Sequence, residues 1–297
     1  MASVTGKPKH PGGPLAGLPW RGPGDGRPDL PLPPGPMPLV SHGLLRKRWR
    51  YVGFYGDEVM LCFASVEIGP MKHCFWSLYD REEGRVLEHT QLRPGTSEVS
   101  MDGVHVGLDA GSANGPVRVS LELGTCEPIE SICPSGRGWG WTRKRAGVPM
   151  TGQVEAFGRT WILDGFGVDD ESAGYQQHHT IWSWSAGVGV DTQGRSLGWN
   201  LTSGINDPPR GSERAVWVDG VPHEPDPVVF EELDAVEFAG RDRLEFSFID
   251  NAERRRNDNF GLIRSKYIHR FGTFSGSLDG VEIAEATGVM EHHAAAW

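Results

Sequence analysis

Residues 178–201 read HHTIWSWSAGVGVDTQGRSLGWNL, and this stretch decides the fold class. Successive side chains of a β-strand point to opposite faces, so Trp182 and Trp184 share one face of a strand. The segment Asp191–Gly194 has the composition of a tight loop and leads into a second strand-like run, SLGWNL. The stretch therefore predicts an antiparallel hairpin with an aromatic face, which forms either packed core or the wall of a ligand cavity.

The two adjacent histidines of this stretch do not predict a metal site. On a strand, His178 shares the tryptophan face and His179 points to the opposite face, so we expect the two imidazoles to diverge. No His-Glu-x-x-His motif or cluster of further ligands stands nearby to complete a coordination shell. We therefore expect no metal at these histidines.

The rest of the chain after Gly43 has the same texture. Short apolar or alternating runs, about twenty in number, are separated by turn residues. Asp-Gly pairs at 102–103, 219–220 and 279–280 stand between such runs, where a two-residue hairpin needs positive φ. No helical stripe exceeds about ten residues. This predicts an all-β protein whose antiparallel sheets close into two tandem barrels or barrel-like sandwiches.

We expect three segments along the chain. Residues 1–40 are predicted to be a disordered tail, because eleven prolines and eight glycines fall within the first 38 residues. Residues 41–150 and 151–297 are predicted to be an N-terminal and a C-terminal β domain. The run 58–67 is apolar on both faces of a strand, so we expect it to be covered on both sides, with the second domain as one cover.

The charge of the chain limits its expected partners. The net charge is −10, whereas binding to nucleic-acid phosphates needs a basic face, so no nucleic-acid partner is expected. Three short basic clusters, 46–50, 142–145 and 254–256, are interpreted as solvated strand ends and loops. Since no run of eighteen apolar residues and no pattern of a secretory signal occurs, we expect no membrane span and a cytoplasmic location.

Carboxylates next to the aromatic hairpin are the candidate catalytic acids. Asp169, Asp170 and Glu171 precede it, and a carboxyl that enters an apolar cavity acquires a raised pKa and remains an acid near neutral pH. The alternative is a solvated acidic loop. Tyr175 either donates a hydrogen bond to a substrate or fills a corner of the barrel. Glu213 is either a buried, paired carboxylate or part of a surface ion pair. We take Asp170, Glu171 and Tyr175 as catalytic candidates.

Glu291 and His293 near the carboxyl end share a strand face and form a second catalytic candidate. A carboxylate can fix the tautomer of an imidazole and raise its basicity, although a solvated pair is the alternative. Ser265, Tyr267 and His269 also share one face, without an orienting acid that the sequence reveals. The predicted ligand-binding residues are aromatic or polar side chains of these strands: His178, Trp182, Trp184, Trp199, Asn200 and Tyr267.

Ordered blocks of the chain resemble a bacterial family known as domain of unknown function 2804. They are LLRKRWRYVGFYGDEVMLCFASVEIGP (44–70), WTRKRAGV (141–148), DDESAGYQQHHTIWSWSAGVGVDTQGRSLGWNL (169–201), SGINDPPRGSERAVWVDGVPHE (203–224), SKYIHRFGTFSGSLDG (265–280) and GVMEHH (288–293). The resemblance extends over residues 44–297. That family is distantly similar to the two-domain lipocalin-like group of carotenoid hydratases, attachment-protein relatives and lipocalin-like cyclases.

This resemblance implies two lipocalin-like barrels and a hydrophobic small-molecule partner. Members of the wider group hydrate or cyclise isoprenoid or polyene substrates without a cofactor, but the resemblance assigns no catalytic residue here. Three functions remain open. The chain is a cofactor-independent hydratase, cyclase or isomerase, or a carrier or sensor of a lipophilic ligand, or an interaction protein with solid barrels. A proton donor, an aromatic surface and exclusion of water are what the enzymatic function requires.

Overall fold

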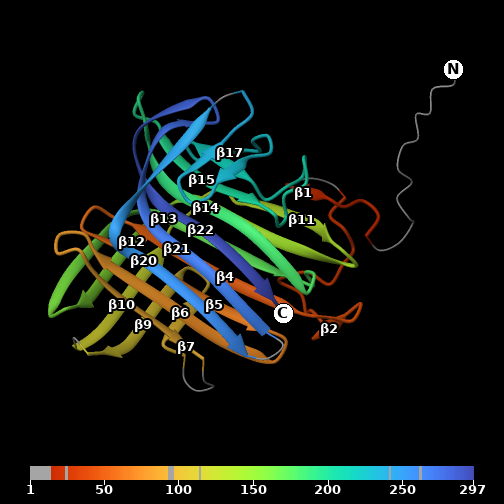
Figure 1. Cartoon of the computed structure of the whole chain (residues 1–297), viewed down its shortest axis with the longest axis horizontal. Coiled ribbons are helices and arrows are strands. Elements are labelled where there is room, and N and C mark those ends of the chain that lie inside the picture. The colour runs from red at the N-terminus through yellow and green to blue at the C-terminus, as the bar shows by residue number, and fades with distance from the viewer. Residues whose placement is uncertain (1–14, 24–25, 93–96, 114, 241, 261–262) are drawn as a thin grey trace.

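The computed structural model describes residues 15–297 apart from 24–25, 93–96, 114, 241 and 261–262. Within this part of the chain every element of regular secondary structure is a β-strand. It therefore contains no helix that could cross a membrane. The strands form two large antiparallel sheets that pack against each other, together with one short hairpin (Figure 1). The prediction of an all-β fold with two antiparallel sheets is confirmed.

The first sheet is formed by residues between Trp20 and Gly174. Its hydrogen-bonded order is β7-β6-β5-β4-β13-β12-β10-β9-β8, with β11 paired to β12 and β1 paired to β11. The bounds are β1 (Trp20–Gly22), β4 (Lys47–Tyr55), β5 (Val59–Ile68), β6 (Met71–Asp80), β7 (Arg85–Gln91), β8 (Val99–Asp102), β9 (His105–Ser112), β10 (Gly115–Leu123), β11 (Ile129–Ser135), β12 (Gly138–Ala156) and β13 (Arg159–Gly174). Since β8 also approaches β5 and β6, the sheet curls around a core of its own.

The second sheet is formed by residues from His179 onward. Its order is β17-β16-β15-β14-β22-β21-β20-β19-β18. The bounds are β14 (His179–Asp191), β15 (Ser196–Ser203), β16 (Ala215–Val218), β17 (Val221–His223), β18 (Val229–Glu231), β19 (Ala235–Glu237), β20 (Arg243–Phe260), β21 (Ile263–Leu278) and β22 (Val281–Ala296). The separate hairpin consists of β2 (Val40–Ser41) and β3 (Leu44–Leu45). The predicted Asp-Gly turns close two of the hairpins, because Asp219 and Asp279 and the glycines after them have positive φ.

A third core lies between the sheets and joins them. It contains Tyr51, Met60 and Cys62 from the first sheet, together with Trp184 and Phe271 from the second. Alternate side chains of β5, such as Leu61 and Phe63, point into the curl of the first sheet instead. This confirms the prediction of cover on both sides for residues 59–64 of the run 58–67, with the second half of the chain as one cover, while Glu58 and Ser65 are exposed.

The chain changes from one sheet to the other between Gly174 and His179. The predicted junction at residue 150 lies inside β12, which pairs with β13 along its whole length. The division at 150 therefore stays a prediction about domains, while the hydrogen-bonded sheets divide some 25 residues later, as the bounds of β13 and β14 show.

The prediction of a disordered tail over residues 1–40 needs correction from residue 15 onward. Residues 1–14 and 24–25 lie outside the described part of the chain. The other residues of this segment pack against the first sheet. Strand β1 pairs with β11, and the side chains of Leu18, Leu32 and Met37 are buried against Trp139 and Tyr175. Composition predicted disorder because it takes no account of this distant apolar surface.

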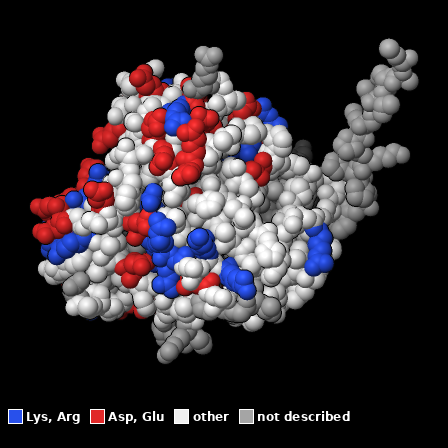
Figure 2. Space-filling view, in the orientation of Figure 1, with Lys and Arg blue, Asp and Glu red and all other residues white. Residues whose placement is uncertain are grey.

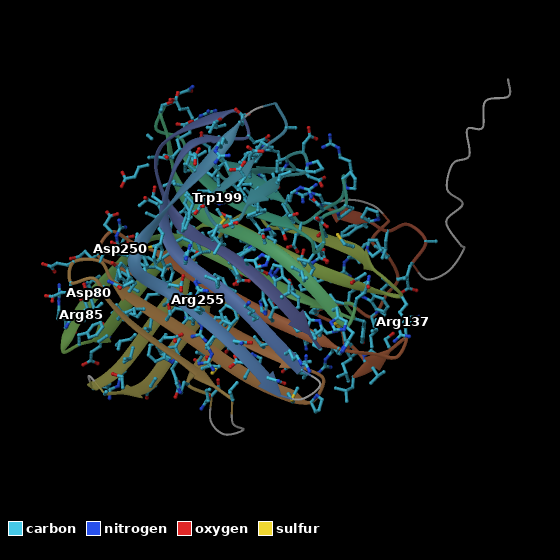
Figure 3. The ribbon with its side chains drawn as sticks, viewed as in Figure 1. Asp80, Arg85, Arg137, Trp199, Asp250 and Arg255 are labelled. Carbon is cyan, nitrogen blue, oxygen red and sulfur yellow. The ribbon has the colours of Figure 1, made fainter. Side chains whose placement is uncertain are left out.

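The strands β20, β21 and β22 extend beyond the core of the second sheet, and there they carry charge. Arg255 and Arg270 both pair with Glu253, at 2.8 and 2.7 Å. Figure 3 places Arg255 on the near side of the molecule, and Figure 2 shows acidic and basic side chains lying next to one another on that face. Part-exposed pairs of this kind contribute little to stability, usually about 1 kcal/mol or less.

A row of three glycines lets large rings fill the core of the second sheet. Gly187, Gly288 and Gly272 are cross-strand neighbours on β14, β22 and β21. The ring of Trp199, which is fully buried (Figure 3), occupies the space above Gly187, and its edge packs against Phe274 with 4.9 Å between ring centroids. A Cβ at Gly187 would meet this ring and would also lie 2.7 Å from the carbonyl oxygen of Thr287.

We therefore expect Gly187→Ala to lower the free energy of unfolding by about 1–3 kcal/mol, because the ring of Trp199 must move out of its packed position. Urea denaturation followed by tryptophan fluorescence measures the change. Gly111→Ala is the matched control, since a Cβ there meets nothing within 4 Å. Equal stability of the two variants would contradict the packing role of the glycine row.

Candidate functional site

A row of polar and aromatic side chains crosses the second sheet on the face that meets the first. Strand register makes neighbours, in order, of Thr202, Trp184, Glu291, His269 and Arg254. Since paired residues of adjacent strands project to the same side of a sheet, this row points toward the first sheet as a unit.

A second row crosses the first sheet and faces it. Register makes neighbours, in order, of Lys144, Asp170, Tyr51, Ala64 and Phe75. The Tyr51 hydroxyl lies 3.1 Å from Nε2 of His269, and its ring meets that of Trp184 edge to face at 5.1 Å. We call these two rows, with Glu213, the inter-sheet layer.

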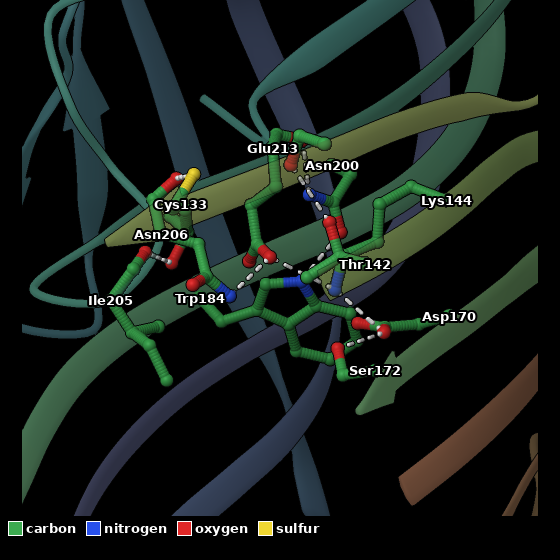
Figure 4. A network of polar contacts seen from close by, with 12 residues as sticks. Cys133, Thr142, Lys144, Asp170, Ser172, Trp184, Asn200, Ile205, Asn206 and Glu213 are labelled. Atoms are coloured by element: carbon green, nitrogen blue, oxygen red, sulfur yellow. Dashed lines mark hydrogen bonds and ion pairs between the residues drawn. The ribbon is translucent and has the colours of Figure 1, made fainter. Parts of the chain in front are cut away.

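Lys144 is the centre of the charged part of the inter-sheet layer (Figure 4). Its Nζ lies 2.6 Å from Oδ1 of Asp170 and 3.4 Å from Oε2 of Glu213, and all three residues are buried. Glu213 belongs to the loop between β15 and β16, so this cluster ties the two sheets together. Asn206 Nδ2 donates a hydrogen bond of 2.9 Å to the same Glu213 oxygen.

One ammonium group cannot neutralise two carboxylates, and the pKa values reflect this. Burial raises the pKa of Asp170 and also that of Glu213, the latter to about 7, while the attraction of Lys144 acts against both shifts. Burial disfavours the charged form of Lys144, but Asp170 and Glu213 keep its pKa above the ordinary value. Lys144 is closer to Asp170, so we assign the ionised carboxylate to Asp170 and the proton near neutral pH to Glu213.

Trp184 is fixed beside this cluster by an amide. Its Nε1 donates to Oδ1 of Asn200 at 2.8 Å, and Nδ2 of Asn200 donates to the carbonyl oxygen of Glu213 at 3.0 Å. A buried indole N–H needs such a partner, and the partner fixes the plane of the ring. The cluster thus has an aromatic wall with a defined orientation (Figure 4).

Tyr51 and His269 form a neutral pair in the same layer. Burial raises the pKa of the Tyr51 hydroxyl well above its ordinary value and lowers the pKa of His269 to about 4. His269 Nδ1 has no hydrogen-bond partner among the residues that the structure describes. The pair can therefore exchange hydrogen bonds with a hydroxyl or carbonyl group without carrying charge itself.

Glu291 belongs to the inter-sheet layer, and His293 lies at its edge as the cross-strand neighbour of Trp182. His293 Nδ1 is 3.7 Å from Oε1 of Glu291, and its Nε2 is 2.9 Å from the Ser265 hydroxyl. Burial opposes ionisation of Glu291, but the neighbouring His293 ring and the indole N–H of Trp182 hold its pKa below the ordinary value. Trp182 Nε1 donates to the same carboxylate at 3.2 Å. Glu291 thus lies beside the His293 ring that contacts Ser265, whereas the sequence had suggested Ser265 and His269 as the pair in need of an orienting acid.

The structure separates the three catalytic candidates near residue 170. Asp170 lies in the inter-sheet layer, whereas Glu171 points to the other face of β13 and pairs with Arg143 at 2.5 Å. Tyr175 is fully buried outside the layer, where its hydroxyl donates to the Pro38 carbonyl oxygen at 2.6 Å. Since all of residues 169–171 belong to β13, the alternative of a solvated loop is wrong.

The predicted ligand-binding residues also divide between the two faces of their strands. Trp182, Trp184, Asn200 and Tyr267 face the first sheet, while Trp199 points into the core of the second. His178 is exposed just before β14, beside the carbonyl oxygen of Trp297 at 2.5 Å.

The predicted divergence of the two adjacent histidines is wrong. Their ring centroids are only 4.6 Å apart. The reason is that β14 begins at His179, so the alternation of a strand does not include His178.

Three buried cations in or beside the layer were not predicted from the sequence. Each basic cluster interpreted as solvated contributes one buried residue: Lys47, Lys144 and Arg254 are at most 3 % exposed. Arg254 pairs with Glu88 at 2.6 Å and lies over the ring of Phe75. Alternation within the strands was the available signal for Lys47 and Lys144, because it sends each to the face opposite its basic neighbours.

Comparisons with known proteins agree with this architecture. The model of the family described as "Domain of unknown function (DUF2804)" matches residues 114–297, and no curated protein matches the chain. The solved structure named "putative AttH" from Nitrosomonas europaea is 14% identical, with a TM-score of 0.52, over 89% of this chain and 98% of that one. Kievitone hydratase from Nectria haematococca is 10% identical, with a TM-score of 0.51, over 84% of this chain and 88% of that one. These likenesses show the fold, and the predicted two-domain lipocalin-like class is confirmed.

Glu213 makes a testable contribution to the pH dependence of stability. Its pKa is about 7 in the folded chain against a usual 4.5, so the folded state binds the proton more tightly and loses stability as pH rises through 7. Relative to wild type, Glu213→Gln should therefore gain up to about 3 kcal/mol between pH 5 and pH 8. Urea unfolding at several pH values measures this. Glu155→Gln, a half-exposed site on β12, should show no such trend; a parallel pH dependence of wild type and Glu213→Gln would contradict the assignment.

Proposed function

The chain belongs to the DUF2804 family, and from the geometry of the inter-sheet layer we propose that it is a cofactor-independent hydratase or isomerase of a hydrophobic small molecule. One observation carries the proposal: Lys144 lies between two buried carboxyl groups, one of which retains a proton near neutral pH. Groups with strongly perturbed pKa values that share a buried site are typical of acid–base catalysis.

The residues divide the chemistry between an acid and a base. Protonated Glu213 donates a proton to an alkene carbon, and ionised Asp170 accepts one from water or from the substrate. The rings of Trp184 and Tyr51 stabilise the positive charge that develops on the substrate. Lys144 keeps the two carboxyl groups in opposite protonation states. Each of these groups is a side chain of the protein, so the proposed chemistry uses no cofactor.

His269 and Tyr51 supply the polar contact that orients the substrate. Nδ1 of His269 is buried, and the residues that the structure describes offer it no partner, so it is available to a substrate hydroxyl or carbonyl group. Trp184 and Tyr51 are themselves nearly buried, so a substrate reaches Glu213 by displacing the Trp184 ring. The part-exposed rings of Trp182 and His293, with centroids 4.1 Å apart, border the edge of the layer where it would enter.

The energetics of the layer support a catalytic role over a purely structural one. Removing ions from water costs several kcal/mol each, and replacing a buried ion pair by apolar side chains is often neutral or stabilising by about 1–4 kcal/mol. Stability alone therefore does not account for Lys144, Asp170 and Glu213. The likeness in fold to kievitone hydratase supports hydration as the reaction class, and the family resemblance favours an isoprenoid or polyene substrate. We also propose a cytoplasmic location, in keeping with four free cysteines.

A carrier of a lipophilic ligand is the second candidate function. The aromatic edge of the layer favours this function. There the ring centroids of Trp182, His293 and Trp297 are 4.1 to 6.4 Å apart. Such a surface holds an apolar guest without any chemistry. A carrier needs no protonated carboxyl group, so the variant that removes the acid separates the two functions.

Incubation in D2O with acyclic isoprenoids, farnesol and geranylgeraniol, tests the enzymatic proposal. Hydration adds the elements of D2O to the alkene and isomerisation introduces one deuterium, and mass spectrometry detects both. We expect turnover by wild type and a loss of about 100-fold or more in Glu213→Gln, as for removal of a general acid.

Glu155→Gln should retain full activity in this assay. Binding without deuterium incorporation in any of the three proteins would favour the carrier, and equal incorporation by wild type and Glu213→Gln would remove Glu213 from the mechanism.

A further inference from the structure

A cavity of about 310 Å³ opens on the other face of the first sheet, at one end of its curl. The side chains that alternate with the inter-sheet row line it: Arg50 with Tyr51, Glu171 with Asp170, and Arg143 with Lys144. The next positions along the same strands add Arg48 and Trp141, whose neighbour between them is Ala173. The cavity and the inter-sheet layer thus share β4, β12 and β13 but not a face.

Most of the charge in this cavity is satisfied within the chain. Arg50 donates to Asp169 at 2.8 Å and to the carbonyl oxygen of Gly103, in the turn between β8 and β9, at 2.8 Å. Arg143 pairs with Glu171. Asp169 also accepts two hydrogen bonds from Arg145. These contacts fix the position of the wall, because each guanidinium is held by at least one carboxylate.

Arg48 is different. This residue is half-buried and lines the cavity. Its side chain makes no hydrogen bond or ion pair with the part of the chain that the structure describes. Its cross-strand neighbour Glu67 is bound to Lys72 at 2.9 Å and to Arg46 at 3.4 Å. In a chain with net charge −10, the cavity therefore presents one guanidinium group to which the described residues offer no counter-ion.

The remaining wall is mixed, with apolar side chains such as Trp141 and Met101 and polar ones such as Ser65 and Ser172. Trp141 and Met101 line the cavity beside the arginines, and the indole N–H of Trp141 is directed away to Glu130. A volume of about 310 Å³ lies at the small end of the range for small-molecule sites, and mouths of β-barrels are a common place for them. One free guanidinium matches one negative charge, and its planar fork matches a carboxylate in a bidentate pair.

We propose that this cavity binds a small organic carboxylate with an apolar or aromatic body, with Arg48 pairing with the carboxylate and Trp141 contacting the body. The site is separate from the acid–base cluster, because it lies on the opposite face of the same strands. It adds a recognition function to the chain that does not depend on the chemistry proposed for Glu213.

Isothermal titration calorimetry of the full chain with 1-naphthoate, and with its neutral analogue 1-naphthamide, tests this. We expect naphthoate to bind at least about tenfold more tightly than the amide, with an affinity that falls as salt is added. Arg48→Gln should remove most of this preference, and Arg48→Lys should keep part of it, because an ammonium group retains the charge but not the fork.

The matched control is Arg118→Gln, which removes one positive charge from an exposed position on β10. It should bind naphthoate as wild type does. Melting temperatures check folding, and Arg48→Gln should melt as wild type because Arg48 has no partner to lose. Equal affinity for acid and amide, or unchanged binding by Arg48→Gln, would overturn the proposal. Glu213→Gln should bind naphthoate normally, so a failure here and a failure of the acid–base chemistry are distinguishable.

Discussion

The face shared by the two sheets is the constraint on which the rest of the structure depends. Each sheet curls around its own apolar core, and a third core between them makes the two halves one body. Charged groups enter this third core with polar partners, as Lys144 does with Asp170 and Glu213 and Arg254 does with Glu88. An unpaired ion there would cost several kcal/mol, so the arrangement of cations and carboxylates across the interface is fixed together with the packing.

Because strand side chains alternate, three central strands serve two chemically different surfaces. Lys144, Asp170 and Tyr51 point toward the second sheet, and their neighbours Arg143, Glu171 and Arg50 point into the cavity of the first. The inter-sheet layer excludes water and perturbs pKa values. The cavity is open, and of its arginines Arg48 has no side-chain partner among the residues that the structure describes. The same backbone hydrogen bonds hold both sets in place, which gives each site a rigid base.

The candidate site could be predicted from the sequence only in part. Asp170, Trp184 and the pair Glu291 and His293 were found, because carboxylates next to alternating aromatic residues are visible in a short window. Lys144 was missed because its cluster of basic residues indicated a solvated segment. Tyr51 and His269 meet across 218 residues of sequence, and only the packing of the two sheets brings them to 3.1 Å.

The sequence by itself determined the local structure: strands, the Asp-Gly turns, and the doubly apolar run in β5. These depend on alternation and on backbone conformation, which short segments encode. Only the tertiary structure decided which face of each strand meets a partner, because that depends on register between distant strands. The same reason explains the proline-rich segment from residue 26 to 38. Its composition predicted disorder, but Leu32 and Met37 are buried in an apolar cluster around Trp139, and no local sequence pattern reveals this contact.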